Sequence, residues 1–173
     1  MKNITIIAAV GKNLELGKDN DLIWHFKGDM RFFREHTLHK PIIMGRKTLE
    51  SLPGLLPERQ HIVLTSSQLD YPDSVLVMHS MEELLSYIEQ QREEFMVIGG
   101  ATIYKQMLPY SDTMLLTEVN AECADADAYF PSFSKGEWNS SVLGVQEEKG
   151  ISYKHLVYTR KKKKRLKSLF LIY

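Results

Sequence analysis

The segment Met96-Val-Ile-Gly-Gly-Ala-Thr-Ile-Tyr104 decides the fold that we predict. Its apolar start predicts a buried strand, Gly99 and Gly100 carry no side chains, and a helix begins directly after them. At such a turn the first backbone N–H groups of the helix and its positive end face any ligand, which suits a phosphate. Taken alone, a tight strand-to-helix turn without a ligand is the simpler interpretation.

A similar arrangement follows the apolar segment Pro41–Met44, which predicts another strand. The next four residues, Gly45–Thr48, place two cations and a hydroxyl at the start of a helix. Two glycine-led helix starts after strands suggest an extended polyphosphate ligand such as a dinucleotide. Ser66 and Ser67, at the end of a further strand, would add hydroxyl contacts, although serines in solvated loops are equally ordinary.

Outward from these turns, short β-rich segments alternate with helical patterns. Ile4–Val10 is almost continuously apolar, which is typical of a strand buried on both faces. Ser80 and Glu83 form a capping box, which predicts the start of a helix. The alternation and the strand-rich end predict a single α/β domain with a mostly parallel sheet and an antiparallel C-terminal edge. The expected strands are Ile4–Val10, Pro41–Met44, His61–Thr65, Val75–Met78, Phe95–Ile98, Met114–Val119, Ser140–Val145 and Tyr153–Thr159; the expected helices are Asp29–Leu38, Arg46–Leu52, Ser80–Gln91 and Ala101 to near Pro109; Gly11–Asp21 is an expected loop.

The length of 173 residues favours one domain with little left over. The 22 basic and 22 acidic residues cancel, but six basic residues follow Arg160 with no acid among them. Residues 1–160 therefore carry a net charge of −6, and nothing in them suggests nucleic-acid binding. We predict a globular body, residues 1–160, with a basic tail, residues 161–173.

The location of the protein is predicted from two further features. Ile4–Val10 is too short to cross a membrane, which needs about 20 apolar residues. It also makes a poor cleavable signal, because no suitable cleavage site follows it. The one cysteine, Cys123, allows no intrachain disulfide, so we expect a protein of the cytoplasm.

Asp29 is the first candidate for chemistry, since it begins an expected helix among apolar and aromatic neighbours. Met30, Phe33 and Thr37 are expected on one face of that helix. An acid at a helix start is common, because the helix dipole favours it there. In an apolar pocket, however, desolvation would raise the pKa of this carboxyl group and suit it to acid–base work.

Several other kinds of site are excluded. Gly11–Lys18 resembles a P-loop, but it has five residues between its glycines instead of four, and Asp19 stands where the motif needs Ser or Thr. No Gly-x-Gly-x-x-Gly and no Gly-x-Ser-x-Gly motif occurs. His36 and His39 are three residues apart, but no nearby Cys or acid completes a ligand set, so we expect no metal.

The motifs considered together are Ile7-Ala-Ala9, Asn20–Trp24, Asp29 with Phe33, Pro41–Ser51, Leu56–Arg59, Val97–Tyr104, Thr117, and Asp127 with Phe130-Pro131. In this order they closely resemble the dihydrofolate reductase family, from about Ile4 to Arg160. The resemblance implies an eight-stranded, mostly parallel twisted sheet with about four helices, so that residues 1–160 form the catalytic domain. It implies an NADPH-dependent oxidoreductase that passes hydride to C6 of 7,8-dihydrofolate and a proton to N5. The product, 5,6,7,8-tetrahydrofolate, supports one-carbon metabolism and the synthesis of thymidylate and purines.

The resemblance also implies roles for individual residues. Asp29 should bond the pterin and, with Thr117 and Trp24, support protonation of N5. Arg59 should pair with the glutamate α-carboxylate, and Arg46 and Ser66 should contact the 2′-phosphate of NADPH. The implied substrate-binding residues are Ile7, Ala8, Asp29, Met30, Phe33, Leu52, Leu56, Arg59, Ile98 and Thr117, and the implied cofactor-binding residues are Ala9, Leu16, Gly17, Gly45, Arg46, Lys47, Thr48, Thr65, Ser66, Ile98, Gly99, Gly100, Ala101, Thr102, Ile103 and Tyr104.

Two departures and two alternatives stay open. Ile23 and Lys27 stand where this family commonly has proline, which puts the rigidity of the preceding loop in doubt. A related reductase of the same fold could act on another pterin or on a pyrimidine of riboflavin synthesis, although Arg59 argues against it. A nucleotide-binding module without activity, which contacts RNA or a membrane through its tail, is the other alternative, although Asp29 and the complete set of cofactor motifs argue against it. We expect a monomer that binds dihydrofolate and diaminopyrimidine antifolates, without nucleic-acid or membrane partners.

Overall fold

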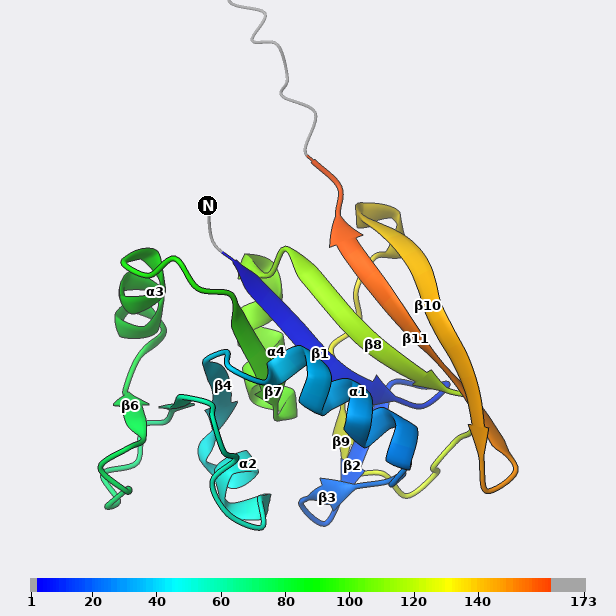
Figure 1. The fold of residues 1–173 in the computed structure, drawn as a ribbon, viewed down its shortest axis with the longest axis horizontal. Coiled ribbons are helices and arrows are strands. Elements are labelled where there is room, and N and C mark those ends of the chain that lie inside the picture. Colours follow the sequence, from blue (N-terminus) through cyan, green and yellow to red (C-terminus); the bar gives the residue numbers. More distant parts are fainter. Residues whose placement is uncertain (1–2, 163–173) are drawn as a thin grey trace, which may run out of the picture.

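The computed structural model describes residues 3–162, and an eight-stranded sheet runs through the molecule (Figure 1). Its strands are β1 (Ile4–Val10), β4 (Ile42–Gly45), β5 (His61–Leu64), β6 (Leu76–Met78), β7 (Phe95–Gly99), β8 (Thr113–Val119), β10 (Trp138–Glu148) and β11 (Ile151–Arg160). They lie in the order β10-β11-β8-β1-β7-β4-β5-β6, and only β10 and β11 run antiparallel to their neighbours. This topology confirms the predicted fold class.

The strand β1 joins the two halves of this sheet. It pairs parallel with β7 on one side, where Ile4 is opposite Phe95, and with β8 on the other, where Ala9 is opposite Thr117. Every residue of β1 except Ala9 is buried, as its continuous apolar run predicts. The strand is therefore completed only by partners that come about 90 residues later, in β7, and about 108 residues later, in β8.

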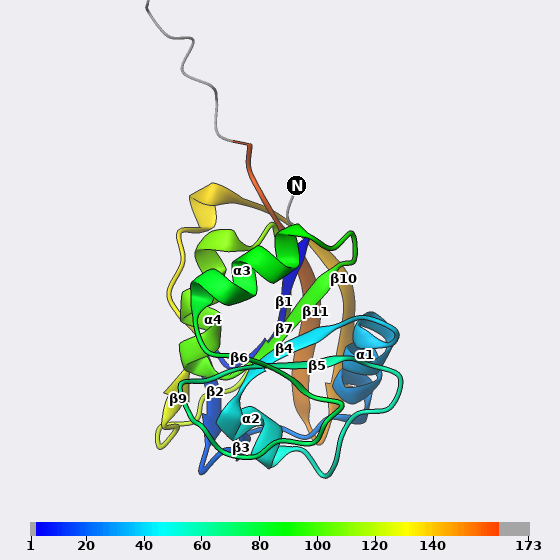
Figure 2. The same cartoon turned by 90° about the vertical axis from the view of Figure 1, so that its left-hand side faces the viewer.

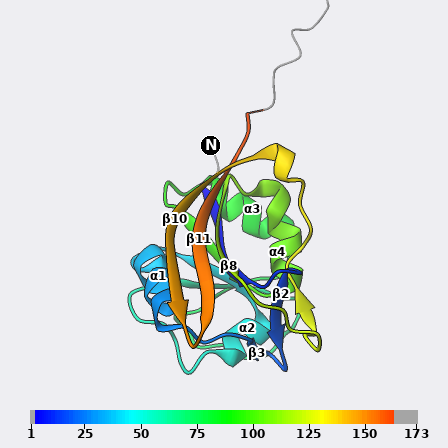
Figure 3. The same ribbon diagram turned by 90° about the vertical axis from the view of Figure 1, so that its right-hand side faces the viewer.

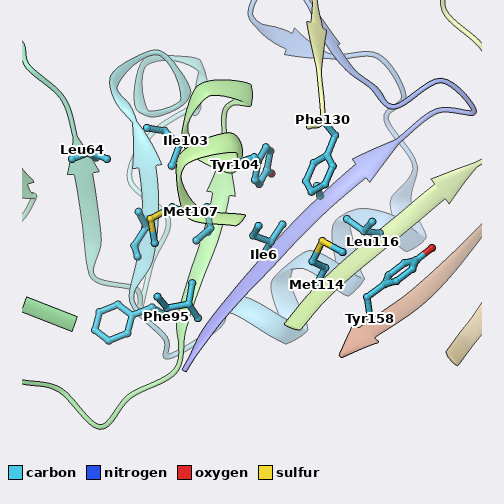
Figure 4. Close-up of a cluster of buried hydrophobic side chains, with 14 of the residues drawn as sticks. Ile6, Leu64, Phe95, Ile103, Tyr104, Met107, Met114, Leu116, Phe130 and Tyr158 are labelled. Carbon is cyan, nitrogen blue, oxygen red and sulfur yellow. The ribbon is translucent and has the colours of Figure 1, made fainter. Parts of the chain in front are cut away.

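The helices form a layer on each side of the sheet. α1 (Lys27–Thr37) covers one face, while α3 (Met81–Glu89) and α4 (Ala101–Met107) cover the other (Figure 2 and Figure 3). Ser80 begins α3 as predicted, and its hydroxyl accepts the Glu83 N–H at 3.1 Å. Apolar side chains of α4 and the strands fill the space between them, among them the labelled Met107 and Leu116 (Figure 4).

The prediction of a loop over Gly11–Asp21 is wrong in part, because this segment contains short strands. A second sheet has the order β3-β2-β9, with β2 (Glu15–Lys18) in the middle, β3 (Asp21–Leu22) and β9 (Ala128–Tyr129). These strands are only two to four residues long. Their polar composition gives no strand pattern, and tertiary contacts order them.

Glu15 supplies such contacts from a buried position. Its carboxylate accepts the backbone N–H groups of Asn13 and Cys123, each at 2.6 Å. Burial by itself would raise the pKa of Glu15, but these backbone donors outweigh it and hold the pKa below its ordinary value. The carboxylate therefore joins the segment around β2 to the loop before β9.

α1 also differs from the prediction. It begins at Lys27 instead of Asp29, because the Glu148 carboxylate of β10 accepts the N–H groups of Lys27 at 2.9 Å and Gly28 at 3.0 Å. A proline at position 27 would have no N–H to donate. The buried residues of α1 are Phe32 and Thr37. Met30 is 60% exposed, so the expected packing face was wrong at Met30.

Most other predicted elements occur with bounds shifted by two residues or fewer. β10 reaches three residues beyond the expected end at Val145, because its pairing with β11 continues to Glu148 opposite Ile151. After α4, a 3₁₀ turn (Leu108–Tyr110) includes the expected helix end at Pro109.

Candidate active site

Two helix starts come together at the carboxyl ends of β4 and β7, which are adjacent parallel strands. α2 (Arg46–Ser51) begins after Gly45 and α4 after Gly100, and neither cap residue satisfies the helix end with a side chain. A Cβ atom added at Gly99 or Gly100 would lie 3.4 Å from Thr48 Oγ1, so glycine keeps the space between the two helix starts open. Gly99 also has φ +136°, a backbone conformation that other residues rarely adopt.

This arrangement fits a polyphosphate. The N–H groups of the α4 start lie beside the Thr48 hydroxyl, and Lys47 belongs to the first turn of α2, so the region favours negative charge. Arg46 is half-buried and pairs with Glu50, Nη1 to Oε1 at 2.7 Å. Ser66 is exposed just after β5, and Thr65 Oγ1 accepts the Ser67 N–H at 3.0 Å.

The remaining predicted cofactor-binding residues lie on either side of these helix starts. Leu16 and Gly17 belong to β2, and Ala9 is the half-buried residue of β1. The Tyr104 hydroxyl of α4 donates to the Ile7 carbonyl at 2.7 Å, and burial raises its pKa. Ala101 and Thr102 form the first turn of α4, Ile103 is buried behind them, and Ile98 precedes Gly99 in β7.

Asp29 lies in the first turn of α1 and is bonded to β8. The Thr117 hydroxyl donates to Asp29 Oδ1 at 2.6 Å, and the Asp29 side chain is 18% exposed. Burial raises the pKa of Asp29, the Thr117 bond opposes this rise, and the charge of Glu148 adds to it. The carboxyl group is thus mostly desolvated, still reachable, and suited to titrate above the range of an ordinary aspartate.

Five of the predicted substrate-binding residues share one apolar cluster on the α1 side of the sheet: Ile7, Phe33, Leu52, Leu56 and Ile98. Ala8 lies in the cluster on the opposite side with Tyr104, because successive side chains of a strand point to opposite faces. The structure therefore separates Ala8 from the other five and leaves Met30 exposed. Trp24 packs against the small cluster of Phe26, Val119 and Tyr153.

Arg59 lies in the loop before β5. Its Nη1 donates to the Pro57 carbonyl at 3.2 Å, while its buried Nε makes no hydrogen bond to any residue in 3–162. Burial and the nearby charge of Arg34 lower the pKa of Arg59. An unpaired buried donor on a cation, beside an apolar cluster, is suited to an anionic ligand.

Sequence reasoning missed two histidines behind this site. His61 is 3% exposed, its Nε2 accepts the Leu56 N–H at 3.0 Å, and its Nδ1 donates to the Arg59 carbonyl at 3.0 Å. His155, also 3% exposed, has Nδ1 at 2.8 Å from Thr117 Oγ1. Each lies in a strand at a position that any buried residue could occupy, so the sequence alone gives no sign of these contacts.

The chain matches the family described as dihydrofolate reductase over residues 3–160. It belongs to the dihydrofolate reductase family. Among curated relatives, the dihydrofolate reductase of Bacillus subtilis is 38% identical over 161 residues, which cover 91% of this chain and 95% of the relative. The dihydrofolate reductase of Haemophilus influenzae is 37% identical over 160 residues, which cover 91% of this chain and 98% of the relative.

A solved structure of a dihydrofolate reductase agrees with this assignment. The Enterococcus faecalis enzyme complexed with NADP(H) and RAB-propyl superimposes with a TM-score of 0.81 at 31% identity, covering 92% of this chain and 96% of that one. Membership of the dihydrofolate reductase family confirms the predicted oxidoreductase activity on dihydrofolate and the predicted NADPH cofactor. Within residues 3–162, no helix is long and apolar enough to cross a membrane, and no group of three metal-ligating residues occurs.

Proposed function

We propose that Asp29 is the carboxylate that orients the pterin and supports protonation of N5 when dihydrofolate becomes tetrahydrofolate. The observation that carries this proposal is the pair Asp29–Thr117, with its 2.6 Å bond, beside the apolar cluster of Ile7 and Phe33. An ionised Asp29 can accept the 2-amino and N3 hydrogens of the pterin. Proton delivery to N5 then passes through water, which the partial exposure of the carboxyl group allows.

NADPH, when bound, supplies the hydride that reduces the pterin. We assign its pyrophosphate to the helix starts of α2 and α4, with Lys47 and Thr48 on one side and the segment Gly99–Ile103 on the other. Arg46 and Ser66 would contact the 2′-phosphate, which requires Arg46 to exchange its Glu50 partner for phosphate. Ala9, Leu16 and Tyr104 would border the nicotinamide.

Arg59 is assigned to the glutamate α-carboxylate of dihydrofolate. Its buried, unpaired Nε supports this assignment, since a carboxylate would satisfy it in the bidentate geometry that only arginine offers. A pterin or a riboflavin-pathway pyrimidine has no glutamate and would leave that donor unpaired. Leu52 and Leu56 would cover the aminobenzoyl group between Arg59 and Asp29.

The remaining parts of the proposal concern the whole chain. We assign the activity to residues 1–160, and we assign the protein to the cytoplasm as a monomer. The single cysteine, Cys123, allows no intrachain disulfide, which suits that compartment. Diaminopyrimidine antifolates, which are cationic when protonated, would pair with Asp29. The tail 161–173 lies almost wholly outside the described residues, and truncation after Arg160 should leave turnover unchanged.

The experiment is an assay of NADPH absorbance with dihydrofolate, repeated with NADH. In Arg46→Ala, the preference for NADPH over NADH should fall about ten- to a hundredfold, because one charged hydrogen bond is worth about 1.5–3 kcal/mol. An unchanged preference in the variant would remove Arg46 from the 2′-phosphate site. Turnover of a pterin without glutamate at the same kcat/KM as dihydrofolate would favour the related reductases instead.

A further inference from the structure

His155 is a buried histidine that lies directly behind the proposed catalytic pair. It is the register partner of Thr117, from β11 to β8, and its Nδ1 is 2.8 Å from Thr117 Oγ1 and 3.9 Å from Asp29 Oδ1. A hydroxyl group has one hydrogen, and Thr117 gives that hydrogen to Asp29 at 2.6 Å. Thr117 can therefore only accept from His155, which must carry its proton on Nδ1.

The contact on the other side of the ring is compatible with this tautomer. His155 Nε2 lies 3.3 Å from Gln146 Nε2, an amide donor, so the unprotonated Nε2 is the acceptor there. The Tyr153 hydroxyl lies 3.1 Å from Gln146 Oε1, but its single hydrogen also has the Glu148 carboxylate as a closer acceptor, so the Thr117 contact and not Gln146 decides the tautomer. Two successive hydrogen bonds, from His155 to Thr117 and from Thr117 to Asp29, thus point toward the carboxylate.

The ring is fixed in place and kept neutral by its surroundings. It stacks on Phe32 of α1 with ring centroids 4.0 Å apart, and Tyr153 contacts it edge-on at 5.6 Å. Burial lowers the pKa of His155, and the charge of His36 on α1 adds to this effect. The acids that face this region are Asp29 on α1 and Glu148 on β10, and Glu148 is bonded to Tyr153 and to the start of α1.

We propose that neutral His155 is a positioning residue: its Nδ1–H occupies the acceptor side of Thr117, directs the Thr117 hydroxyl hydrogen onto Asp29 and so stabilises the ionised carboxylate. Without this donor the hydroxyl group is free to rotate and to accept from a protonated Asp29 instead. The inference rests on the proposed role of Asp29 in catalysis. A ring that only filled space against Phe32 would need no nitrogen at all.

Two substitutions separate the donor from the ring. His155→Phe keeps a ring against Phe32 but has no N–H, whereas His155→Asn places an amide N–H near the Nδ1 position and loses the ring. We would follow the ¹³Cγ shift of Asp29 against pH in the full chain without ligands. His155→Phe should raise the Asp29 pKa by about half a unit to one unit, because a bond that favours the charged form is weakened. His155→Asn should stay close to the original titration although it melts at a lower temperature.

A double substitution tests the route through Thr117. In Thr117→Val the bond to Asp29 is absent, so adding His155→Phe should leave the Asp29 titration where Thr117→Val alone puts it. The alkaline limb of kcat, measured with saturating NADPH, should move in the same direction as the titration in His155→Phe. If turnover does not follow Asp29 while the titration moves, the role of Asp29 fails and the positioning by His155 stands.

The unmodified chain supplies the measurement that does not depend on any variant folding. The ¹⁵N shifts of the His155 imidazole should report a neutral ring protonated at Nδ1 between pH 7 and 8. A ring protonated at Nε2, or on both nitrogens, would overturn the proposal. So would an Asp29 titration that is identical in His155→Phe and the original chain, or one that shifts as far in His155→Asn as in His155→Phe.

Discussion

The candidate site has two charged ends, Asp29 and Arg59, and burial affects the two groups with different results. At the Asp29 end, burial raises the pKa of the carboxyl group; at the Arg59 end, burial lowers the pKa of the guanidinium. Both shifts favour the neutral form. The ordinary pKa of aspartate lies a few units below neutrality, so a rise brings it toward working pH, whereas arginine stays charged after its shift. One end can titrate during function, and the other is a permanent cation.

A buried histidine lies behind each end of the site. One of these histidines contacts a side chain, and the other contacts the backbone. His155 bonds a side chain, Thr117, and so acts on the charge distribution around Asp29. The His61 ring bonds two backbone groups, the Leu56 N–H and the Arg59 carbonyl, and so acts on the position of the loop. From this comparison we expect the Asp29 end to govern the rate and its pH dependence, and the Arg59 end to govern affinity.

The largest expected effect is that of Asp29→Asn, because it removes the titrating group itself. Turnover at neutral pH should fall about 10²–10⁴-fold, the usual contribution of a positioned acid or base. The variant should regain activity as the pH falls, since more substrate is then already protonated at N5. A pH profile of kcat with saturating NADPH measures this, and turnover within about threefold of the original at neutral pH would break the comparison.

Arg59→Lys should act at the other end, on affinity and not on rate. Lysine keeps the charge but loses the bidentate geometry, and a charged hydrogen bond of about 1.5–3 kcal/mol corresponds to roughly a ten- to hundredfold rise in KM for dihydrofolate. The value of kcat should change far less, because the contact is remote from the reacting atoms. A loss confined to kcat would place Arg59 elsewhere.

His61→Leu should weaken the Arg59 end more mildly. Two bonds of about 0.5–1.5 kcal/mol each hold the loop, so losing them should raise KM several-fold with kcat unchanged. A pterin without glutamate is the matched control, and its KM should rise less. An equal rise in KM for both substrates would mean that the substitution displaces the loop around Leu56 and does not act through Arg59.

His61 also gives a pH test, whose sign is the same as that of a carboxylate with a lowered pKa but whose effect begins at a higher pH. Burial lowers the pKa of His61, so the folded chain keeps the ring neutral while the unfolded chain takes up a proton below the ordinary histidine value. Stability should therefore fall as the pH drops below about 6.5. His61→Leu should remove this part of the pH dependence of the melting temperature.

The smallest effect is expected from an ion pair outside both ends. Lys18 and Asp125 pair on the exposed surface, where water and salt screen the attraction. Asp125→Asn should leave kcat, KM and the melting temperature within error of the original. A clear change in KM for dihydrofolate would show that a residue outside both ends also contributes to substrate affinity.

How far the sequence predicts the molecule depends on the range of the interactions. The sheet, the two helix starts and Asp29 follow from local patterns, such as the apolar run of β1 and the glycines before α4. The pairing of Asp29 with Thr117 comes from the resemblance to a family, since 88 residues separate them. Ser80 as the helix cap of α3 was predicted locally, and the structure confirms it.

What the sequence could not predict consists of single polar residues whose partners are distant. Glu15 appears in a polar segment that predicts a solvated loop, yet it is buried on backbone donors that include the Cys123 N–H, 108 residues away. His61 and His155 occupy strand positions with no pattern of their own. Lys27 stands where the family commonly has proline, and the sequence does not show that its backbone N–H donates to the distant Glu148 carboxylate. In each case tertiary structure overrides local preference.

The central position of β1 has a consequence for synthesis on the ribosome. β1 is made first, but its neighbours β7 and β8 begin only at Phe95 and Thr113. At about 5–20 residues per second, roughly 5–20 s pass before those neighbours have been translated. During that interval the segment Ile4–Val10 is an unpaired apolar strand, the kind of segment that chaperones bind and that aggregates when crowded. The centre of the sheet, where β1 pairs with β7 and β8, can then form only late, from contacts far apart in the chain, which slows folding.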